Sequence, residues 1–337
     1  MTEIASVEVD ESPAAAAEPA AGQDGPSAPK VTIGLPVYNG EKYLPVAIES
    51  ILTQDFADFE IVISDNASTD ATEQIGRAAA ADDPRVRYIR QPVNLGMSRN
   101  YHAVLAAARG QYFRWAAADD EVTAGYLAGC VAALDADPDV ALAHAQVVDM
   151  DENGVITHEH PPLDVDNPDP VRRLRALLGV HESSDHYGLI RTEVLRSLPP
   201  LGSHPEPDRV ILVGLGLRGR IVHAPGEQFR RRVHSTQTSG PGHRTSAKVR
   251  IHDPRRSGLG LPAFELGRDL LREIHNAPLT RRQKRACYLA MWGWFRLNYM
   301  KMARNVARLV IELAETAGRG LGRLFRRPGK AAAKAGA

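Results

Sequence analysis

The chain has 337 residues, of which 43% are hydrophobic, so it is long and apolar enough for one large or two medium domains. Its formal net charge is zero, and its two cysteines are isolated, which argues against a zinc site and a disulfide framework and fits a reducing cytosol. The N-terminus does not read as a signal peptide, and no apolar run approaches the roughly 20 residues that cross a bilayer. We therefore expect a cytoplasmic protein that is soluble or peripheral at the inner face of the membrane.

Charge and low-complexity sequence are concentrated at the two ends of the chain. Residues 1–29 are rich in Ala, Pro, Gly, Ser and acidic residues, and we expect a disordered leader. Residues 281–337 carry fourteen Lys and Arg against only two Glu, which suggests an anionic partner or a solvated end. The last part, residues 326–337, is expected to be a disordered basic tail.

From residue 30 onward, short apolar runs alternate with helical patterns. Strands are predicted at residues 31–35, 60–64, 86–91 and 112–116, with the first ended by Pro36. Helices are predicted at residues 41–53, from after Asp70 through 81, at 98–108 and at 122–134. This alternation indicates parallel strands joined by crossover helices, in an open α/β sheet.

Polar residues follow three of these strands, where an open α/β sheet binds its ligands. Tyr38 and Asn39 come after the first strand, Asp65 ends the second, and Asp119 and Asp120 follow the fourth. Any one aspartate could be the N-cap of the next helix. Because the carboxyl ends of parallel strands meet at one edge, the convergence of all three favours a binding site.

The second half of the chain has a less regular pattern. Strands are predicted at residues 140–148, 186–190, 220–224 and 228–233, with a loop-rich insertion at 149–169 and a helix at 171–178. Two prolines delay the next helix, so Asp208 is expected to cap a helix at 209–218. The GxGxxG at residues 214–219 ends a helix and follows no strand, so it does not indicate a dinucleotide site.

A set of short motifs occurs in order over about ninety residues. They are Pro36-Val37-Tyr38-Asn39, the run from Phe59 to Asp70, Asn94-Leu95-Gly96 with Arg99-Asn100, Gly110-Gln111-Tyr112 and Asp119-Asp120. Together they make residues 30–120 resemble the nucleotide-sugar-binding half of a family 2 glycosyltransferase. The resemblance implies the GT-A fold, a Rossmann-like open mixed sheet with flanking helices.

The resemblance also implies roles for single residues. Nucleotide-sugar binding would fall to Pro36, Tyr38, Asn39, Asp65, Arg99 and Asp119. Among these, Tyr38 would stack near the base, Asp65 would accept a hydrogen bond from it, and Asp119 would contact the ribose. Asp120 would bind a divalent metal, Mn²⁺ or Mg²⁺, since hard cations prefer carboxylate oxygens. Many members have a further aspartate two residues before the doublet, and Ala117 stands there in this chain.

Two later segments complete the implied site. Glu206-Pro207-Asp208 is similar to the segment that presents the general base, usually an adjacent Glu-Asp pair; Asp208 matches best, and Glu206 is the alternative. Arg231-Arg232-Val233-His234 resembles a motif whose histidine completes the metal site, which makes His234 the second expected ligand. Residues 235–246 would then be a lid over the diphosphate.

These patterns divide the chain into a catalytic domain and a helical extension. Residues 30–255 would form the GT-A domain, with a nucleotide-binding half at 30–120 and an acceptor half at 121–255. Residues 256–325 would form an amphipathic helical extension, in which Leu289, Trp292, Tyr299 and Val310 share a face. We expect this stripe to pack on the catalytic domain or a second subunit; the alternative is peripheral membrane contact through residues 281–325.

The predicted function is an inverting, metal-dependent glycosyltransferase of the hexosyl or N-acetylhexosaminyl class. It would use a UDP-linked donor and an acceptor hydroxyl on a cell-surface polysaccharide, a glycolipid or a secondary metabolite. The alternatives are a nucleotide-sugar-binding protein without activity and a nucleotidyltransferase. A nucleic-acid partner is not expected, because Lys301, Arg304 and Arg308 of the last helix lie opposite the face that carries its aromatic residues.

Overall fold

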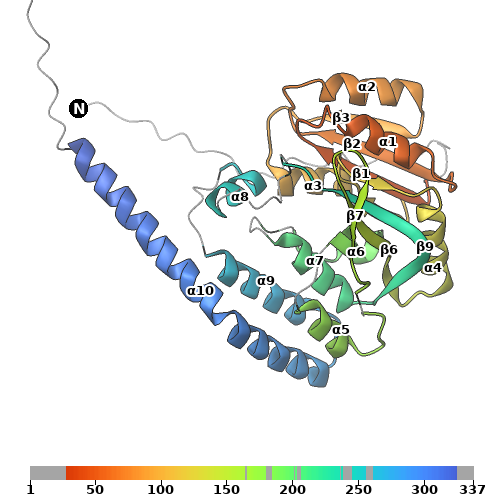
Figure 1. The fold of residues 1–337 in the computed structure, drawn as a ribbon. Helices are drawn as coiled ribbons and strands as arrows, with labels where there is room; N and C mark the ends of the chain where they lie inside the picture. The colour runs from red at the N-terminus through yellow and green to blue at the C-terminus, as the bar shows by residue number, and fades with distance from the viewer. Residues whose placement is uncertain are drawn as a thin grey trace, which may run out of the picture.

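The computed structural model of the chain describes residues 28–163, 165–179, 184–200, 202, 206–235, 237, 245–255 and 261–324 (Figure 1). A nine-stranded sheet runs through the molecule in the order β3-β2-β1-β4-β8-β6-β9-β5, with β7 paired to β6. The predictions for the leader before residue 28 and for the tail after residue 324 lie outside the described residues.

The first four strands are parallel, as predicted. They are β1 (Val31–Val37), β2 (Phe59–Asp65), β3 (Val86–Arg90) and β4 (Tyr112–Trp115). The prediction that Pro36 ends the first strand is wrong, because β1 continues through it and pairs Pro36 with Ser64. Pairing between β1 and β4 stops at Gly34. The missing N–H of Pro36 would point to that same side, so no ladder hydrogen bond is lost.

The other strands make the sheet mixed. They are β5 (Glu121–Val122), β6 (Val140–Met150), β7 (Ile156–Glu159), β8 (Leu189–Arg191) and β9 (Arg220–Arg232). β8 is antiparallel to both β4 and β6, and β9 is parallel to β6 and antiparallel to β5.

Three predictions in this half need correction. The predicted insertion at 149–169 contains β7, which folds back on β6 as a hairpin. The two strands predicted at 220–224 and 228–233 are one strand, β9, whose register with β6 shifts near Gly226, a glycine at φ 89°. The helix predicted at 122–134 starts later, because Glu121 and Val122 pair with β9 first.

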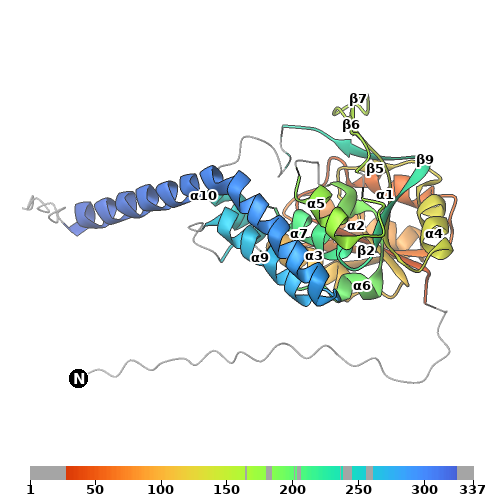
Figure 2. The same cartoon turned by 90° about the horizontal axis from the view of Figure 1, so that it is seen from below.

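Helices cover both faces of the sheet (Figures 1 and 2). One face carries α1 (Leu44–Leu52), α2 (Thr72–Asp82) and α4 (Tyr126–Ala136), whose apolar sides share a core with β1 and β2. The other face carries α3 (Met97–Ala106), α5 (Pro170–Leu177), α6 (Thr192–Arg196), α7 (Pro207–Gly216), α9 (Pro262–Asn276) and the start of α10 (Arg281–Leu324). The remaining short elements are η1, a 3₁₀ turn (Ser184–Tyr187), and α8 (Thr245–His252).

The C-terminal helices join the second core. Leu266, Leu270 and Ile274 of α9 pack with α7, so the segments on either side of the predicted boundary at residue 255 share one hydrophobic core. α10 is a single helix that contacts α9 and α5 and then extends beyond the rest of the molecule (Figure 2).

The packing face of α10 is not the predicted one. Cys287, Met291 and Trp294 are buried against the core, whereas Leu289 and Trp292 of the predicted stripe are 72% and 68% exposed. The expectation that the stripe packs on the catalytic domain is therefore wrong. Within the described part of the chain, none of the helices has a stretch long and apolar enough to span a bilayer.

Candidate active site

The acidic doublet lies in the loop between β4 and β5, at the carboxyl edge of the parallel strands. Arg232, the last residue of β9, holds this loop. Its backbone N–H donates to Oδ1 of Asp120 at 2.8 Å, and its Nε donates to the carbonyl oxygen of Asp119 at 3.0 Å. The same guanidinium pairs with Glu121 and lies 4.8 Å from the ring centroid of Tyr43. A nearly buried arginine thus fixes the doublet in place.

The carboxylate of Asp119 faces His234, two residues beyond the end of β9. Nε2 of His234 lies 3.0 Å from Oδ2 of Asp119. Adjacent ligands of an octahedral ion with bonds of about 2.0–2.1 Å are about 2.9 Å apart, so this pair fits one divalent ion. Among the residues that the structure describes, no cluster of three His, Cys, Asp or Glu could hold a metal. Further ligands would come from a bound diphosphate and water, as is usual for Mg²⁺.

Asp120 has a different environment. It is 8% exposed, and one of its carboxylate oxygens accepts the backbone N–H of Arg232. Burial and the neighbouring carboxylate of Asp119 hold the pKa of Asp120 well above its usual range. A cation beside the doublet would oppose this shift, because it favours the ionised forms. The predicted division of roles stays a prediction, but the contact with His234 comes from Asp119.

The loop after β1 is tied to the loop after β2. Asn39 has a φ of 53°, which asparagine tolerates better than most residues. Its N–H donates to Oγ of Ser68 at 2.9 Å, and its side-chain oxygen accepts the N–H of Thr69 at 2.9 Å. Next to it, Tyr38 is 50% exposed at the carboxyl edge. The ring is therefore accessible for stacking on a base, whereas Pro36 is buried in the strand.

Asp65 is fully buried at the end of β2. Its Oδ1 accepts the N–H of Ser68 at 2.8 Å, its Oδ2 accepts the hydroxyl of Tyr88 at 2.6 Å, and it pairs with Arg90. Burial alone would raise the pKa of Asp65, but these hydrogen bonds and the charge of Arg90 outweigh it and lower the pKa. The geometry favours support of the following loop over direct contact with a base.

The sequence analysis missed Tyr88 and Arg90. Both point to the same side of β3, two residues apart, and the register places Arg90 opposite Asp65. The sequence signal for these two partners of Asp65 would have been a tyrosine and an arginine at alternate positions of the strand that follows β2.

Arg99 lies in the first turn of α3 and is half-buried. Among the described residues it has no hydrogen-bond or ion-pair partner, so its guanidinium is available to a ligand. The next residue, Asn100, fixes the helix to the sheet: its Nδ2 donates to the carbonyl oxygen of Ser64 at 2.9 Å, and its Oδ1 accepts the hydroxyl of Ser64 at 2.6 Å.

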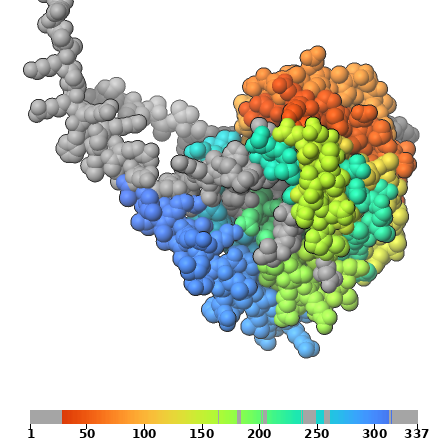
Figure 3. Space-filling model, viewed as in Figure 1, coloured from red at the N-terminus to blue at the C-terminus, as the bar shows by residue number. Residues whose placement is uncertain are grey.

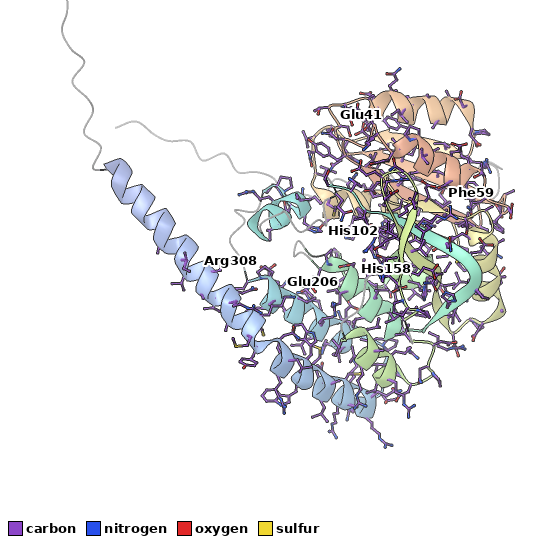
Figure 4. All side chains as sticks on the ribbon, in the orientation of Figure 1. Glu41, Phe59, His102, His158, Glu206 and Arg308 are labelled. Carbon is purple, nitrogen blue, oxygen red and sulfur yellow. The ribbon has the colours of Figure 1, made fainter. Side chains whose placement is uncertain are left out.

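Both candidates for the base lie at the start of α7; Glu206 is labelled in Figure 4. The helix begins at Pro207 with Glu206 in the cap position, so the prediction that Asp208 is the N-cap is wrong; proline is well tolerated as the first helical residue. Glu206 pairs with Lys301 of α10 at 2.6 Å and with Arg209 at 3.4 Å. Asp208 makes no such pair with the described residues. The carboxylate of Glu206 is thus engaged by two cations, whereas that of Asp208 is not engaged by any described cation.

A buried tyrosine pair lies within range of the charges of the doublet and of Asp208. The hydroxyls of Tyr101, from α3, and Tyr187, from η1, are 3.1 Å apart. Burial, together with nearby carboxylates that include Asp119 and Asp208, raises the pKa of Tyr101 to about 12. The indole N–H of Trp115 donates to the carbonyl oxygen of Tyr101 at 3.2 Å and holds this part of α3 on the sheet. Neither tyrosine was singled out from the sequence, which predicted a strand around residue 187.

The predicted lid, residues 235–246, lies mostly outside the described residues. The same is true of Ser203, His204 and Pro205 before α7.

Residues 32–198, about half of the chain, match Glycosyl transferase family 2. A curated relative, the GalNAc(5)-diNAcBac-PP-undecaprenol beta-1,3-glucosyltransferase of Campylobacter jejuni, is 35% identical over 100 residues, which are 29% of this chain and 32% of that protein. Among solved structures, S. aureus TarS 1-349 in complex with UDP-GlcNAc has a TM-score of 0.58 at 20% identity, over 76% of this chain and 69% of that chain. The mannosyltransferase PcManGT from Pyrobaculum calidifontis, in complex with GDP-Man and Mn²⁺, has a TM-score of 0.50 at 17% identity, over 89% of this chain and 81% of that chain.

The mixed sheet, its flanking helices and these structural neighbours define a GT-A fold. The chain belongs to glycosyl transferase family 2, through residues 32–198. It spans about a third of the Campylobacter relative that it matches.

Proposed function

We propose that this chain transfers a sugar from a nucleoside-diphosphate sugar to an acceptor hydroxyl, with inversion at the anomeric carbon. The observation that carries the proposal is the Asp119–His234 pair, 3.0 Å apart at the carboxyl edge of the parallel strands; Asp208, at the start of α7, supplies the second carboxylate. A pair of side chains that can bind a metal, and a carboxylate that is not ion-paired to any described residue, are the two features that such a transfer needs.

The donor is proposed to be a UDP-linked hexose or N-acetylhexosamine. The exposed ring of Tyr38 and the guanidinium of Arg99 offer a stacking surface and a cation to a nucleotide. The presence of UDP-GlcNAc in the S. aureus neighbour supports the choice of nucleotide. Asp65 would act through the loop that it supports, whereas Asn39 fixes the position of Tyr38.

Asp119 and His234 are proposed to hold a divalent ion, Mn²⁺ or Mg²⁺, with Asp120 behind them. Mn²⁺ in the Pyrobaculum neighbour supports this cofactor. When bound, such an ion neutralises the diphosphate and makes it a better leaving group. Arg232 would keep the doublet in place during the reaction, because it binds both the Asp119 carbonyl and the Asp120 carboxylate.

Asp208 is proposed to accept the proton of the acceptor hydroxyl. As that oxygen forms its bond to the anomeric carbon, the bond from this carbon to the phosphate oxygen breaks, and the nucleoside diphosphate leaves with the electron pair. Attack from the face opposite the leaving group inverts the configuration. The Tyr101–Tyr187 pair, which lies near both carboxylates, would bind hydroxyls of the transferred sugar.

The acceptor is proposed to belong to cell-surface glycan synthesis, and a lipid-linked glycan is the first choice. The name of the Campylobacter relative describes a glucosyltransferase that acts on an undecaprenol-linked acceptor. Acceptor contacts would come from the part of the chain after β5, where the family resemblance gives no residue-level guide.

A donor screen tests the proposal. The full chain is incubated with UDP-, GDP- and dTDP-sugars, with Mn²⁺ or with EDTA, and free nucleotide is measured. We expect Mn²⁺-dependent release of UDP from one UDP-sugar and faster release when the acceptor is added. Tight binding without turnover of any donor would favour the non-catalytic alternative. Absence of both binding and release would overturn the proposal.

A further inference from the structure

Helix α10 carries an apolar surface that none of the described residues covers. We define the α10 stripe as Leu289, Trp292, Tyr299, Met300, Val310 and Ile311. Each of these side chains is more than half exposed. Residues 292, 299 and 310 lie on one line along the helix, and residues 289, 300 and 311 lie on the adjoining line, because steps of seven and eleven residues return to nearly the same angle. Helix α10, in blue, runs along one edge of the molecule in Figure 3.

The stripe is not needed to attach α10 to the protein. Cys287, Met291 and Trp294, on another face of the helix, are buried in the core that α9 and α5 share. The helix is therefore already docked at its start, and its exposed apolar face is left for something else. Exposed patches of this size on a helix usually mark an interaction surface.

The charge of α10 indicates which kind of partner the stripe would bind. Residues 281–311 contain eight Lys and Arg and no Asp or Glu. Arg285, Arg296 and Arg304 are exposed beside or within the stripe. Two copies of this surface placed face to face would bring only positive charges together, which disfavours a homodimer through the stripe. An anionic surface would match it.

We propose that the α10 stripe lies in the interface of an anionic membrane. An interfacial helix combines an apolar face containing Trp and other large residues with Lys and Arg around it, and it lies parallel to the bilayer. Trp292 and Tyr299 would sit at the level of the headgroups, and the arginine stems would reach back to the lipid phosphates. Each Lys or Arg near such a surface adds to the attraction.

The position of α10 relative to the site gives this contact a consequence. Lys301 of α10 pairs with Glu206, which is labelled in Figure 4 and lies directly before α7, the helix that carries Asp208. Residue 301 lies across α10 from the stripe, so a membrane bound along the stripe would be separated from the start of α7 by the width of α10. This consequence rests on the proposed function, whereas membrane binding itself does not.

Intrinsic fluorescence tests the proposal directly. The chain has three tryptophans, and Trp115 and Trp294 are 1% and 5% exposed. A blue shift on adding vesicles would thus report Trp292. We expect it with vesicles of phosphatidylcholine and phosphatidylglycerol, and not with phosphatidylcholine alone. The shift should be absent in Trp292→Phe, although that variant should still bind.

Sedimentation with the same vesicles measures the affinity. The double variant Trp292→Ser/Tyr299→Ser should bind at least about tenfold more weakly, because two large apolar side chains leave the interface. Arg296→Gln/Arg304→Gln should lose a similar factor, and its binding should depend less on salt. Matched controls elsewhere on the surface, Val155→Ser for exposure and Arg77→Gln for charge, should bind like the unchanged chain.

Three outcomes would overturn the proposal: no binding to anionic vesicles, equal binding by the stripe variants and their controls, or a concentration-dependent dimer that the stripe variants abolish. Circular dichroism of each variant shows whether α10 has kept its helix, and Trp292→Phe keeps the test valid if the serine variant does not fold. None of these measurements uses sugar transfer, so a failure here is distinct from a failure of the proposed function.

Discussion

Nζ of Lys301 lies 2.6 Å from Oε1 of Glu206, although 95 residues separate them in sequence. With Arg209 on its other side, Glu206 is held by two cations at the start of α7. The contact joins the C-terminal helix to the segment that presents Asp208. The contact also distinguishes Glu206 from Asp208, the two acidic residues that the sequence left as alternatives for the general base, because it is made by Glu206.

Asp208→Asn should lower kcat by about 10² to 10⁴, the usual contribution of a positioned general base, and leave donor binding unchanged. Glu206→Gln should lower kcat by less than about tenfold, because its carboxylate is engaged by Lys301 and Arg209. Steady-state rates of transfer and a separate titration of UDP would measure both effects. If Glu206→Gln gave the larger loss in kcat, the assignment of the base would have to be reversed.

Asp119→Asn and His234→Ala should each weaken Mn²⁺-dependent UDP binding by at least about tenfold, because each removes one ligand of the proposed ion. Calorimetric titration of UDP, with Mn²⁺ and with EDTA, separates the metal-dependent part. His158→Ala, at an exposed histidine of β7, is the matched control. If Asp120→Asn removed the metal dependence and Asp119→Asn did not, the ion would instead be held by Asp120.

Tyr101→Phe and Tyr187→Phe should reduce transfer by about threefold to tenfold each, the range expected for one lost hydrogen bond to the sugar. The effect should depend on the configuration of the sugar, since only some hydroxyls can reach the pair. Tyr112→Phe is the control, because its hydroxyl donates to Asp135 at 2.7 Å on the other face of the sheet. Equal losses with every donor sugar would indicate a merely structural role for the pair.

Asp65→Asn should destabilise the fold by about 1–3 kcal/mol, because a buried carboxylate with three partners loses its charge beside Arg90. UDP affinity should fall only as far as the loop becomes disordered. Urea unfolding and UDP titration on the same preparation compare the two. A large loss of affinity at unchanged stability would show that Asp65 contacts the base directly.

Glu60 is expected to make stability depend on pH. Burial alone would raise its pKa, but Arg109, Thr32 and Arg87 outweigh burial and lower the pKa below the usual value of 4.5. Since the folded pKa is the lower one, this stabilisation is complete above pH 4.5 and is lost as the pH falls through the folded pKa. Glu60→Gln should therefore cost about 1.5–3 kcal/mol at neutral pH, the range for hydrogen bonds to a charged group, and progressively less in acid, as urea unfolding would show.

The first half of the fold could be predicted because its signals are local. The strands β1 to β4 are short apolar runs with helical patterns between them, and their parallel arrangement follows from the length of the connections. The predicted ends of the strands were wrong where pairing between strands determines them. Pro36, for example, stays in β1 because β4 ends before it.

The second half could not be predicted to the same degree, because its structure depends on long-range pairing. Glu121 and Val122 look helical in sequence and become a strand because β9 passes beside them. Arg232 carries no local signal for holding the doublet; its partners lie 112 and 113 residues away. The α10 stripe has the correct period for a core face, but periodicity does not say which of two apolar faces meets the protein.

The contacts of β9 determine which fragments of the chain can keep the sheet intact. The family match ends at residue 198, yet β9 supplies the parallel partner of β6, and with it Arg232 and the strand that leads to His234. A fragment that stops at residue 198 would leave the long edge of β6 unpaired on one side and open to association with other chains. The segment that resembles the family most is therefore not a portable module, because β9 and the core that α9 shares with α7 both lie beyond residue 198.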